Sequence, residues 1–404
     1  MNEVRALVEA FDGAKQRGEQ CALATIVSVE GSSYRRPGAR MLVCEGGTST
    51  GTISAGCLEG DVIEHAKRVI KAGEAMLIEY DTASTSDEMA WGLGLGCNGI
   101  VRVLVEPLAS GSLYVEALRR SCEAHDDAHV LVATVYQHIP SESAMAEGRV
   151  ETGARLFINH EGEVSREKLT DPVAVMLESE VRTLSSEGET SGARVYDVDG
   201  GSVKVFLETL LPPVPLVVFG AGHDALPVIE LAHQLGWQTE VVDLQARPAT
   251  RSRFAVADRV TLARPEDVAL RVSITPRTLT LLMSHNYSHD LALLRFLLSS
   301  PASYIGVMGP RKRTERMLSE LAAREDIFRL EEADLARLYA PSGLDIGANA
   351  PAEIALSIIA EMRAVLDGRG GGMLRERRGS IHGSTSDGER IPSAEKQELQ
   401  VAVA

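Results

Sequence analysis

A short apolar strand that runs into a glycine turn constrains the fold of this chain more than any other stretch. Residues 216–219 read Leu-Val-Val-Phe, and residues 220–225 read Gly-Ala-Gly-His-Asp-Ala. A helical run follows to residue 235, and a second strand ends at Asp243. Short, fully apolar strands are typical of parallel sheets that helices cover on both faces. The order of strand, glycine turn, helix and strand therefore predicts a Rossmann-type, doubly wound sheet.

The same glycine turn predicts a phosphate-binding site. Gly220 and Gly222 let the backbone come close to a ligand, and the start of the following helix favours negative charge. Asp243 stands where it can accept a hydrogen bond from a ribose hydroxyl. His223 and Asp224 stand where the helix begins, so helix capping is the alternative role for both side chains.

Further β-α units follow this turn. Strands are expected at 279–283 and 304–308, each leading into a helix, and a closing helix is expected at 351–366. His285 and His289 follow the first of these strands. A zinc site would need more ligands than this pair, and the sequence offers no obvious third one, so polar loop contacts are favoured.

Three consecutive basic residues open the helix after the strand at 304–308. They are Arg311, Lys312 and Arg313. Positive charge at a helix start opposes the helix dipole. These side chains therefore either bind an anion or lie in solvent.

Two cysteines framed by glycines mark the first half of the chain. Cys57 lies in the stretch 51–61, Gly-Thr-Ile-Ser-Ala-Gly-Cys-Leu-Glu-Gly-Asp, and Cys97 lies in 91–99, Trp-Gly-Leu-Gly-Leu-Gly-Cys-Asn-Gly. Glycine permits a positive φ or close approach to a ligand, so this framing indicates a site. The alternative is that both thiols are small buried side chains, which is the usual fate of a free cysteine.

The first half of the chain also repeats itself. Three strand-like segments recur in the same order, at 23–27, 38–43 and 99–106 and again at 131–135, 153–158 and 201–208. We interpret residues 1–211 as a duplicated α/β domain with halves at about 20–108 and 130–210. The second half contains no cysteine and lacks both glycine-rich loops. The loops of the first half are then additions to a shared scaffold, where function usually lies. Chance similarity between short apolar strands is the alternative.

The remaining segments complete the expected organisation. Residues 210–215 are rich in proline and predict a stiff linker. A Rossmann-type domain is expected at 212–367. The stretch 368–404 is rich in Gly, Arg, Ser and Glu without apolar periodicity, and we expect it to be disordered.

Composition narrows the class of protein. The chain has 404 residues and a formal net charge of −16, which argues against a nucleic-acid or acidic-membrane binder. It contains no uninterrupted apolar run of ~18 residues and no signal-peptide core. Its five cysteines are too few and too scattered for a disulfide framework. We therefore expect a cytoplasmic protein.

These stretches together resemble the XdhC/CoxI family, which are maturation factors for molybdenum hydroxylases such as xanthine dehydrogenase. The resemblance implies binding of the molybdenum cofactor, association with a cysteine desulfurase that supplies the terminal sulfur, and delivery into an apo molybdenum hydroxylase. It also implies a homodimer, and an N-terminal family domain followed by a Rossmann-type domain. The matching motifs lie at 31–40, 56–61, 94–99, 219–223, 304–313 and 343–347, whereas residues 109–211 match least specifically.

The resemblance gives the phosphate-binding turn a ligand. The molybdenum cofactor is a pterin dithiolene with a phosphate, either molybdopterin or its dinucleotide form. Gly220, Gly222 and His223 would hold the phosphate, and Arg311 would be a second anchor. Asp243 would contact a ribose only in the dinucleotide form.

The resemblance also gives the cysteines a role. Thiolates suit a soft metal–sulfur centre, and sulfur transfer needs a thiolate. Cys57 is the first choice to contact the molybdenum–sulfur centre, and Cys97 is the second. We expect the phosphate end to be held by the Rossmann-type half, and the two loops to meet across a domain cleft.

Two other functions remain open from the sequence. An NAD(P)-binding Rossmann oxidoreductase would explain the glycine turn, although the sequence offers no convincing acid–base set and we assign no catalytic residue. A regulatory nucleotide-binding protein without chemistry is the third possibility. We favour a cofactor-insertion chaperone over a turnover enzyme.

Overall fold

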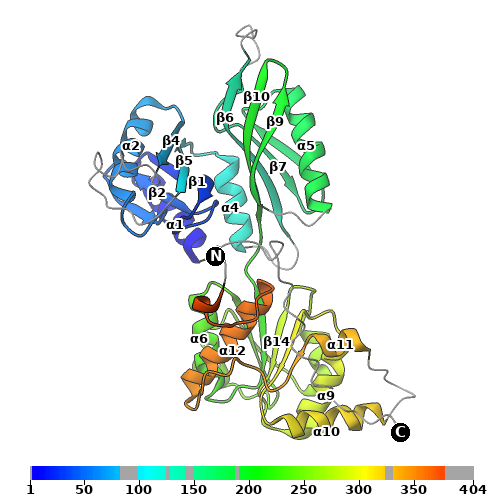
Figure 1. Ribbon diagram of the computed structural model, residues 1–404. Helices are drawn as coiled ribbons and strands as arrows, with labels where there is room; N and C mark the ends of the chain where they lie inside the picture. Colours follow the sequence, from blue (N-terminus) through cyan, green and yellow to red (C-terminus); the bar gives the residue numbers. More distant parts are fainter. Residues whose placement is uncertain are drawn as a thin grey trace. The chain divides into compact units, whose positions relative to one another are not determined.

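The computed structural model describes residues 2–81, 99–123, 128–141, 150–186, 191–323 and 331–377. The chain divides into two compact units, Met1–Pro212 and Pro213–Ala404, which are treated separately below (Figure 1). No helix in the described part is both long enough and apolar enough to cross a membrane.

The first unit begins with a five-stranded antiparallel sheet in the order β3-β2-β1-β5-β4. The described part of this half contains α1, α2 and α4, and α2 packs on one face of the sheet through an apolar cluster. The strands are β1 (Cys21–Gly31), β2 (Arg40–Cys44), β3 (Ser49–Gly51), β4 (Met76–Asp81) and β5 (Gly99–Leu108). The helices are α1 (Asn2–Gln16), α2 (Glu59–Ala72) and α4 (Leu113–Glu123).

A second antiparallel sheet follows in the order β8-β7-β6-β10-β9, with helix α5 (Asp171–Ser186) packed on it. Position by position, this order matches that of the first sheet. A shift in strand register recurs as well. In the first sheet the pairing of β1 with β5 shifts between Ile26 and Ser28 of β1, and in the second sheet the pairing of β6 with β10 shifts between Lys204 and Val205 of β10. The strands are β6 (Val130–Pro140), β7 (Arg155–Asn159), β8 (Val164–Glu167), β9 (Gly192–Val198) and β10 (Gly201–Leu210).

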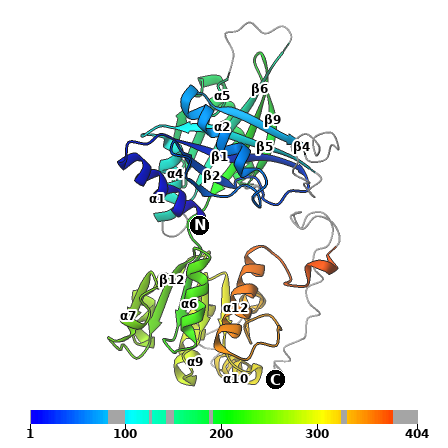
Figure 2. The same ribbon diagram turned by 90° about the vertical axis from the view of Figure 1, so that its left-hand side faces the viewer.

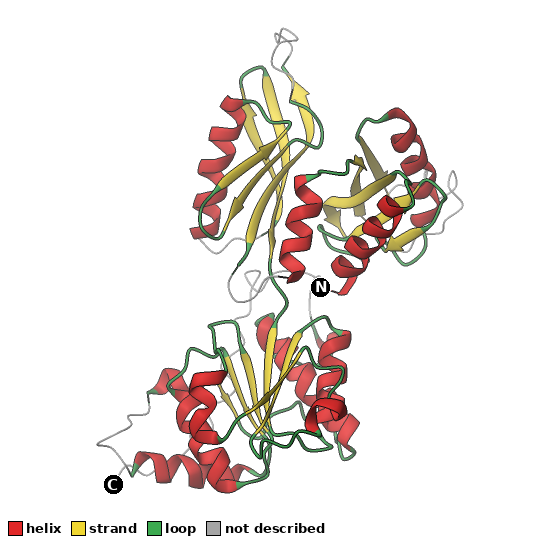
Figure 3. Ribbon diagram, turned by 180° about the vertical axis from the view of Figure 1, so that it is seen from behind, coloured by secondary structure: helices red, strands yellow, loops and turns green. Residues whose placement is uncertain are grey.

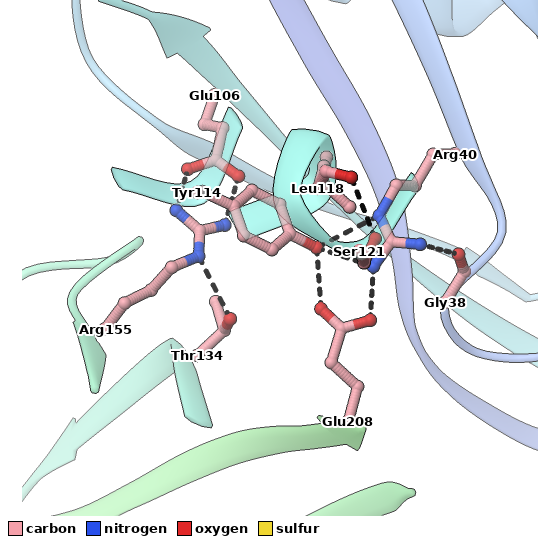
Figure 4. Close-up of polar contacts among 9 residues, drawn as sticks. All are labelled: Gly38, Arg40, Glu106, Tyr114, Leu118, Ser121, Thr134, Arg155 and Glu208. Atoms are coloured by element: carbon pink, nitrogen blue, oxygen red, sulfur yellow. Dashed lines mark hydrogen bonds and ion pairs between the residues drawn. The ribbon is translucent and has the colours of Figure 1, made fainter. Parts of the chain in front are cut away.

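The two sheets of the first unit are joined by buried ion pairs (Figure 4). Arg40 in β2 pairs with Glu208 in β10, and Arg155 in β7 pairs with Glu106 in β5. Tyr114 of α4 lies between them, because its hydroxyl donates to Glu208 Oε1 at 2.6 Å while Arg155 stacks on its ring at 3.9 Å. Each half therefore supplies one arginine and one glutamate to the other.

The second unit is a six-stranded parallel sheet in the order β13-β12-β11-β14-β15-β16 (Figure 2). Helices cover both faces of this sheet (Figure 3). Helices α6 and α12 contribute to the core on one face, whereas α9 and α10 contribute to the core on the other. The predicted doubly wound Rossmann-type sheet, in a protein of mixed α/β class, is thereby confirmed.

The strands of this unit are β11 (Pro215–Phe219), β12 (Gln238–Asp243), β13 (Arg259–Leu262), β14 (Leu279–Leu282), β15 (Tyr304–Val307) and β16 (Leu338–Tyr339). Its helices are α6 (Ala225–Gln234), α7 (Thr250–Arg253), α8 (Val268–Arg271), α9 (Tyr287–Leu298), α10 (Arg311–Ala322), α11 (Glu332–Ala336) and α12 (Pro351–Leu366). Short 3₁₀ turns are η2 (Pro265–Asp267) and η3 (Leu374–Glu376). The strand order reverses between β11 and β14, so ligands of such a sheet are expected at the carboxyl ends of these two strands.

Candidate functional site

The glycine turn lies at this reversal point of the parallel sheet. Gly220 directly follows β11 with a φ of 127°, and a Cβ there would come within 2.4 Å of the Met283 carbonyl oxygen at the end of β14. Only glycine fits such a close approach of two backbones. Gly222 follows, and α6 begins three residues later at Ala225. The turn therefore presents backbone and a helix start together, as binding of a phosphate requires.

An acid–histidine pair bridges the two strand ends. His285 Nε2 lies 2.6 Å from Asp224 Oδ2, so the segment after β14 is tied to the start of α6. His285 has a φ of +55°, which is rare for a residue with a side chain. His223 beside this pair is exposed. Asp224 places a negative charge beside the turn, and the histidine partly offsets that charge when protonated.

The two histidines considered for zinc do not act together. His285 pairs with Asp224, whereas the backbone N–H of His289 donates to the Asn286 side chain, which caps α9. Within the described ranges, no group of three or more His, Cys, Asp or Glu side chains is placed to hold a metal ion. Both residues instead form polar contacts in the loop, as favoured from the sequence.

A basic side chain that the sequence did not reveal reaches the glycine turn. Arg253 ends α7, and its Nη2 donates to the carbonyl oxygen of Ala221 at 2.5 Å. Ala221 lies between Gly220 and Gly222 of the glycine turn. The Arg253 Nε is buried and has no hydrogen-bond partner among the residues that the structure describes. A buried donor without an acceptor is costly, so this guanidinium is suited to an anionic ligand. Arg253 and Ala221 are 32 positions apart in the chain, so the sequence does not reveal this contact.

Asp243 has a full set of partners inside its own loop. The residue is 1% exposed, and its carboxylate accepts from Gln245 N at 3.0 Å, from Arg247 Nε at 3.2 Å and from Thr250 Oγ1 at 2.5 Å. Burial alone would raise the pKa of Asp243, but these hydrogen bonds outweigh burial and lower the pKa below its usual value. Asp243 therefore holds the loop after β12, and because it is buried, its predicted contact with a ribose requires this loop to move.

The basic start of α10 splits into exposed and internal side chains. Arg311 and Lys312 are exposed at the first positions of this helix. Arg313 instead pairs with Asp290 at 2.7 Å, and Asp290 is 1% exposed. Arg311 thus remains available as the predicted second anion anchor, whereas Arg313 has a structural partner.

Cys57 lies in an ordered loop between β3 and α2. Ser54 organises the loop, because its hydroxyl accepts from Leu58 N at 3.1 Å and donates to Glu59, the first residue of α2. Burial would raise the pKa of Glu59, but the hydrogen bonds from Ser54 lower it below its usual value. Gly56 has a φ of 103°, so the residue before the cysteine must be glycine or strained. Cys57 is half-buried and lies close to the start of α2.

A polar cluster continues along α2 from this loop. Asp61 accepts a hydrogen bond from the Tyr80 hydroxyl at 2.6 Å, and His65 Nε2 lies 3.4 Å from the same carboxylate oxygen. Burial, and then the bond to Asp61, raises the pKa of Tyr80 far above its usual value. His65 Nδ1 is buried and, within the described ranges, has no hydrogen-bond partner.

Cys97 and its glycine loop lie outside the described residues. Cys57 and the glycine turn belong to different units, so their joint use stays a prediction. A pocket of about 510 Å³ on the second unit is lined by none of the predicted site residues. Its lining residues are Pro265, Glu266, Ala269, Ala292, Arg295, Phe296 and Ser299.

Comparison with known proteins identifies relatives along most of the chain. Residues 216–362 match the XdhC Rossmann domain, and residues 14–81 match the XdhC and CoxI family. A probable xanthine dehydrogenase subunit of Bacillus subtilis is 31% identical over 352 residues, covering 87% of this chain and 95% of the relative. The molybdenum cofactor insertion chaperone PaoD of Escherichia coli is 23% identical over 369 residues, covering 90% of this chain and 87% of the relative.

A solved structure shows the same architecture. The crystal structure of a xanthine dehydrogenase from Bacillus halodurans superposes with a TM-score of 0.70 at 29% sequence identity. The match covers 90% of this chain and 96% of the other. The similarity therefore spans both units and not the Rossmann-type unit alone.

Proposed function

Because this chain belongs to the XdhC and CoxI family, we propose that it binds the molybdenum cofactor and delivers it into an apo molybdenum hydroxylase of the xanthine dehydrogenase kind. In this proposal the chain acts in the cytoplasm as a homodimer, and a cysteine desulfurase supplies the terminal sulfur. The protein serves as a cofactor chaperone and not as a turnover enzyme. The names of its relatives, one a molybdenum cofactor insertion chaperone, support this role.

The observation that carries the proposal is the phosphate-binding turn with Arg253 beside it. The turn offers close backbone approach at Gly220, the start of α6 and a guanidinium whose Nε has no hydrogen-bond partner in the described part of the chain. These features match a phosphate, which every form of the molybdenum cofactor carries. Gly222 and His223 border the same turn, and exposed Arg311 lies at the start of α10 as a second anion anchor.

The thiol of Cys57 is proposed to contact the molybdenum–sulfur end of the cofactor. The bound cofactor would supply a soft metal–sulfur centre, for which a thiolate is a suitable neighbour. Gly56 and Ser54 hold this cysteine in a defined loop, where its half-buried side chain borders the apolar cluster beneath α2 and keeps part of its surface exposed. Cys97 is proposed as the second thiol on the basis of its sequence context alone.

The geometry of Asp243 supports the cofactor form without a nucleotide. Both carboxylate oxygens already accept hydrogen bonds within the loop after β12. Asp243 is only 1% exposed, so a ribose would reach its carboxylate only after this loop moves. The same argument weighs against NAD(P) as the resident ligand, because its ribose would meet the same obstacle.

The decisive experiment compares Arg253→Ala with Arg251→Ala. Both residues lie on α7 and carry the same charge, but Arg251 is exposed and Arg253 reaches the turn. The full chain would be purified from molybdenum-replete cells, and molybdenum and pterin per chain would be measured by metal analysis and mass spectrometry. We expect at least a tenfold loss of bound cofactor for Arg253→Ala and near wild-type content for Arg251→Ala. Equal content in the two variants contradicts the proposed phosphate site, and a nicotinamide nucleotide in place of molybdenum contradicts the proposed function.

The thiol is tested separately with Cys57→Ser and with Cys122→Ser as its control. Cys122 is also half-buried but lies on α4, outside the loop. Cys57→Ser should lower cofactor content or its transfer to an apo-hydroxylase while leaving the unfolding midpoint unchanged. Wild-type content and transfer in this variant would remove Cys57 from the proposal.

A further inference from the structure

Two other cysteines face each other on the first sheet. Cys21 begins β1 and Cys44 ends β2, and the antiparallel register places them directly opposite one another. Their side chains lie among residues of α1 and α4, whereas Cys57 borders the cluster beneath α2. This pair is therefore separate from the proposed cofactor site.

The ladder places these cysteines at the closest kind of cross-strand position. The neighbouring pair is hydrogen-bonded, because Glu45 N donates to the Gln20 carbonyl oxygen at 2.8 Å. Hydrogen-bonded and non-hydrogen-bonded pairs alternate along an antiparallel ladder, so Cys21 and Cys44 form a non-hydrogen-bonded pair. Such pairs have Cα atoms about 4.5 Å apart, which lies within the range that a disulfide spans.

The thiols themselves are already in contact. The two Sγ atoms lie 2.8 Å apart, and the residues are only 2% and 4% exposed. A disulfide of about 2.05 Å therefore requires a small approach of two sulfur atoms and no rearrangement of the strands.

We propose that Cys21 and Cys44 are an oxidation site that a small peroxide converts into a cross-strand disulfide. One thiolate attacks a peroxide oxygen, and the O–O bond breaks to give a sulfenic acid and hydroxide, which takes up a proton to form water. The second thiol then attacks the sulfenic sulfur, forming the S–S bond and releasing a second water. The two cysteines lose two electrons in total, and the peroxide gains them.

The surroundings make this a slow site that favours small oxidants. Burial, and then the neighbouring thiol, raises the pKa of Cys21 to about 12, with Glu19 raising it further and Arg17 lowering it. Thiolate is therefore scarce near neutral pH, and the reduced pair persists under mild conditions. Leu7, Phe11 and Ala14 of α1 cover the thiols, so a bulky disulfide reagent has to wait for this helix to open.

Helix α1, which covers the two thiols, is also linked to the start of the loop that contains Cys57. Glu3 of α1 binds Arg35, and Arg35 donates to Thr52 Oγ1 at 3.0 Å, five residues before Cys57. A disulfide beneath α1 would anchor the strands on which this helix rests. Oxidation is therefore expected to stabilise these strands and α1, which support the Cys57 loop, against local unfolding.

The test counts thiols in the intact full-length chain. Reduced protein would be treated with hydrogen peroxide, denatured, alkylated and weighed by mass spectrometry, and its peptides would be mapped. All five cysteines of the reduced chain should be alkylated, whereas three should be alkylated after oxidation, with a peptide linking Cys21 to Cys44. Oxidised glutathione should give the same link more slowly.

Variants assign the pair without depending on the proposed function. Cys44→Ala should abolish the link, and Cys122→Ala should retain it with one fewer alkylated thiol. The oxidised wild type should also unfold at a temperature several degrees higher than the reduced protein. Five alkylated thiols after peroxide, or a link that involves Cys57, Cys97 or Cys122, overturns the proposal even if Cys44→Ala fails to fold.

Discussion

Arg40 and Glu208 lie 168 residues apart in the chain and form an ion pair in the interior of the first unit, with side chains only 7% and 5% exposed. Arg155 and Glu106 form the reciprocal pair, with side chains 3% and 8% exposed (Figure 4). Tyr114 makes the two pairs unequal, because its hydroxyl accepts from Arg40 Nε at 3.0 Å. In the other pair the corresponding Nε, that of Arg155, donates to Thr134 at 3.1 Å.

Removing one charge of this pair should destabilise the first unit severely. Glu208→Gln leaves the buried Arg40 guanidinium without a carboxylate, which is expected to cost about 3–5 kcal/mol of unfolding free energy. Urea denaturation measures the loss. Asp367→Asn serves as the control, because its pair with Arg363 lies on the surface and is worth ~0–1 kcal/mol. A loss below that of the control would mean that water reaches the Arg40–Glu208 pair.

Gly220 and Gly222 of the glycine turn should tolerate substitution differently. A Cβ at Gly220 meets the Met283 backbone oxygen at 2.4 Å, whereas a Cβ at Gly222 meets the Asp224 carboxylate at 2.3 Å, and a side chain can turn away. Gly220→Ala should therefore lower the unfolding free energy by about 1–3 kcal/mol from backbone strain alone. Gly222→Ala should cost clearly less. Thermal unfolding of both variants tests this order, which equal losses would contradict.

The stability contributed by Asp243 should vanish in acid. Its pKa is lowered in the folded protein, so its contribution is complete above the unfolded value of about 3.9 and declines as pH falls toward the folded value. Asp243→Asn should be less stable than wild type at pH 7 by about 1–3 kcal/mol, from the lost hydrogen bonds. Urea unfolding at pH 7 and near pH 3 should show this difference shrinking in acid. A constant difference would show that Asp243 keeps the same pKa on folding.

Neutralising Asp224 should strengthen anion binding at the glycine turn. Its carboxylate lies at the start of α6, where it competes with a phosphate for the same positive end of the helix. Asp224→Asn should tighten binding of inorganic pyrophosphate several-fold, or about 1 kcal/mol, in a calorimetric titration. His285→Asn is the matched change, since it frees the carboxylate from its partner and should weaken binding. Weaker binding by Asp224→Asn would mean that the carboxylate organises the turn.

The strands and the phosphate turn could be predicted because their signals are local. Apolar runs such as Leu216–Phe219 of β11 and the glycines after them occupy consecutive positions, and the helix predicted at 351–366 is α12 itself. The edge strand β13 gave no such signal, because it has four residues and begins with exposed Arg259.

Long-range partners could not be predicted in this way. Arg253 and the glycine turn are distant in sequence, and their contact depends on where α7 ends beside the sheet. The ion pairs do leave a trace in the sequence. Arg40 and Arg155 occupy the same place in the repeated segments, as do Glu106 and Glu208. Charged residues that recur inside apolar strands indicate partners for one another, although only the fold shows that each arginine pairs with the glutamate of the other half.

The reciprocal ion pairs bear on how many copies of the Cys57 loop each chain presents. An exchange in which each half supplies the same residue types to the other is the pattern of a two-fold contact between identical subunits, here contained in one chain. The loops do not share that symmetry, since residues 130–210 contain no cysteine. A scaffold built in duplicate thus presents one Cys57 loop per chain. Under the proposed function, each chain would load one cofactor and offer its client a single, unambiguous orientation.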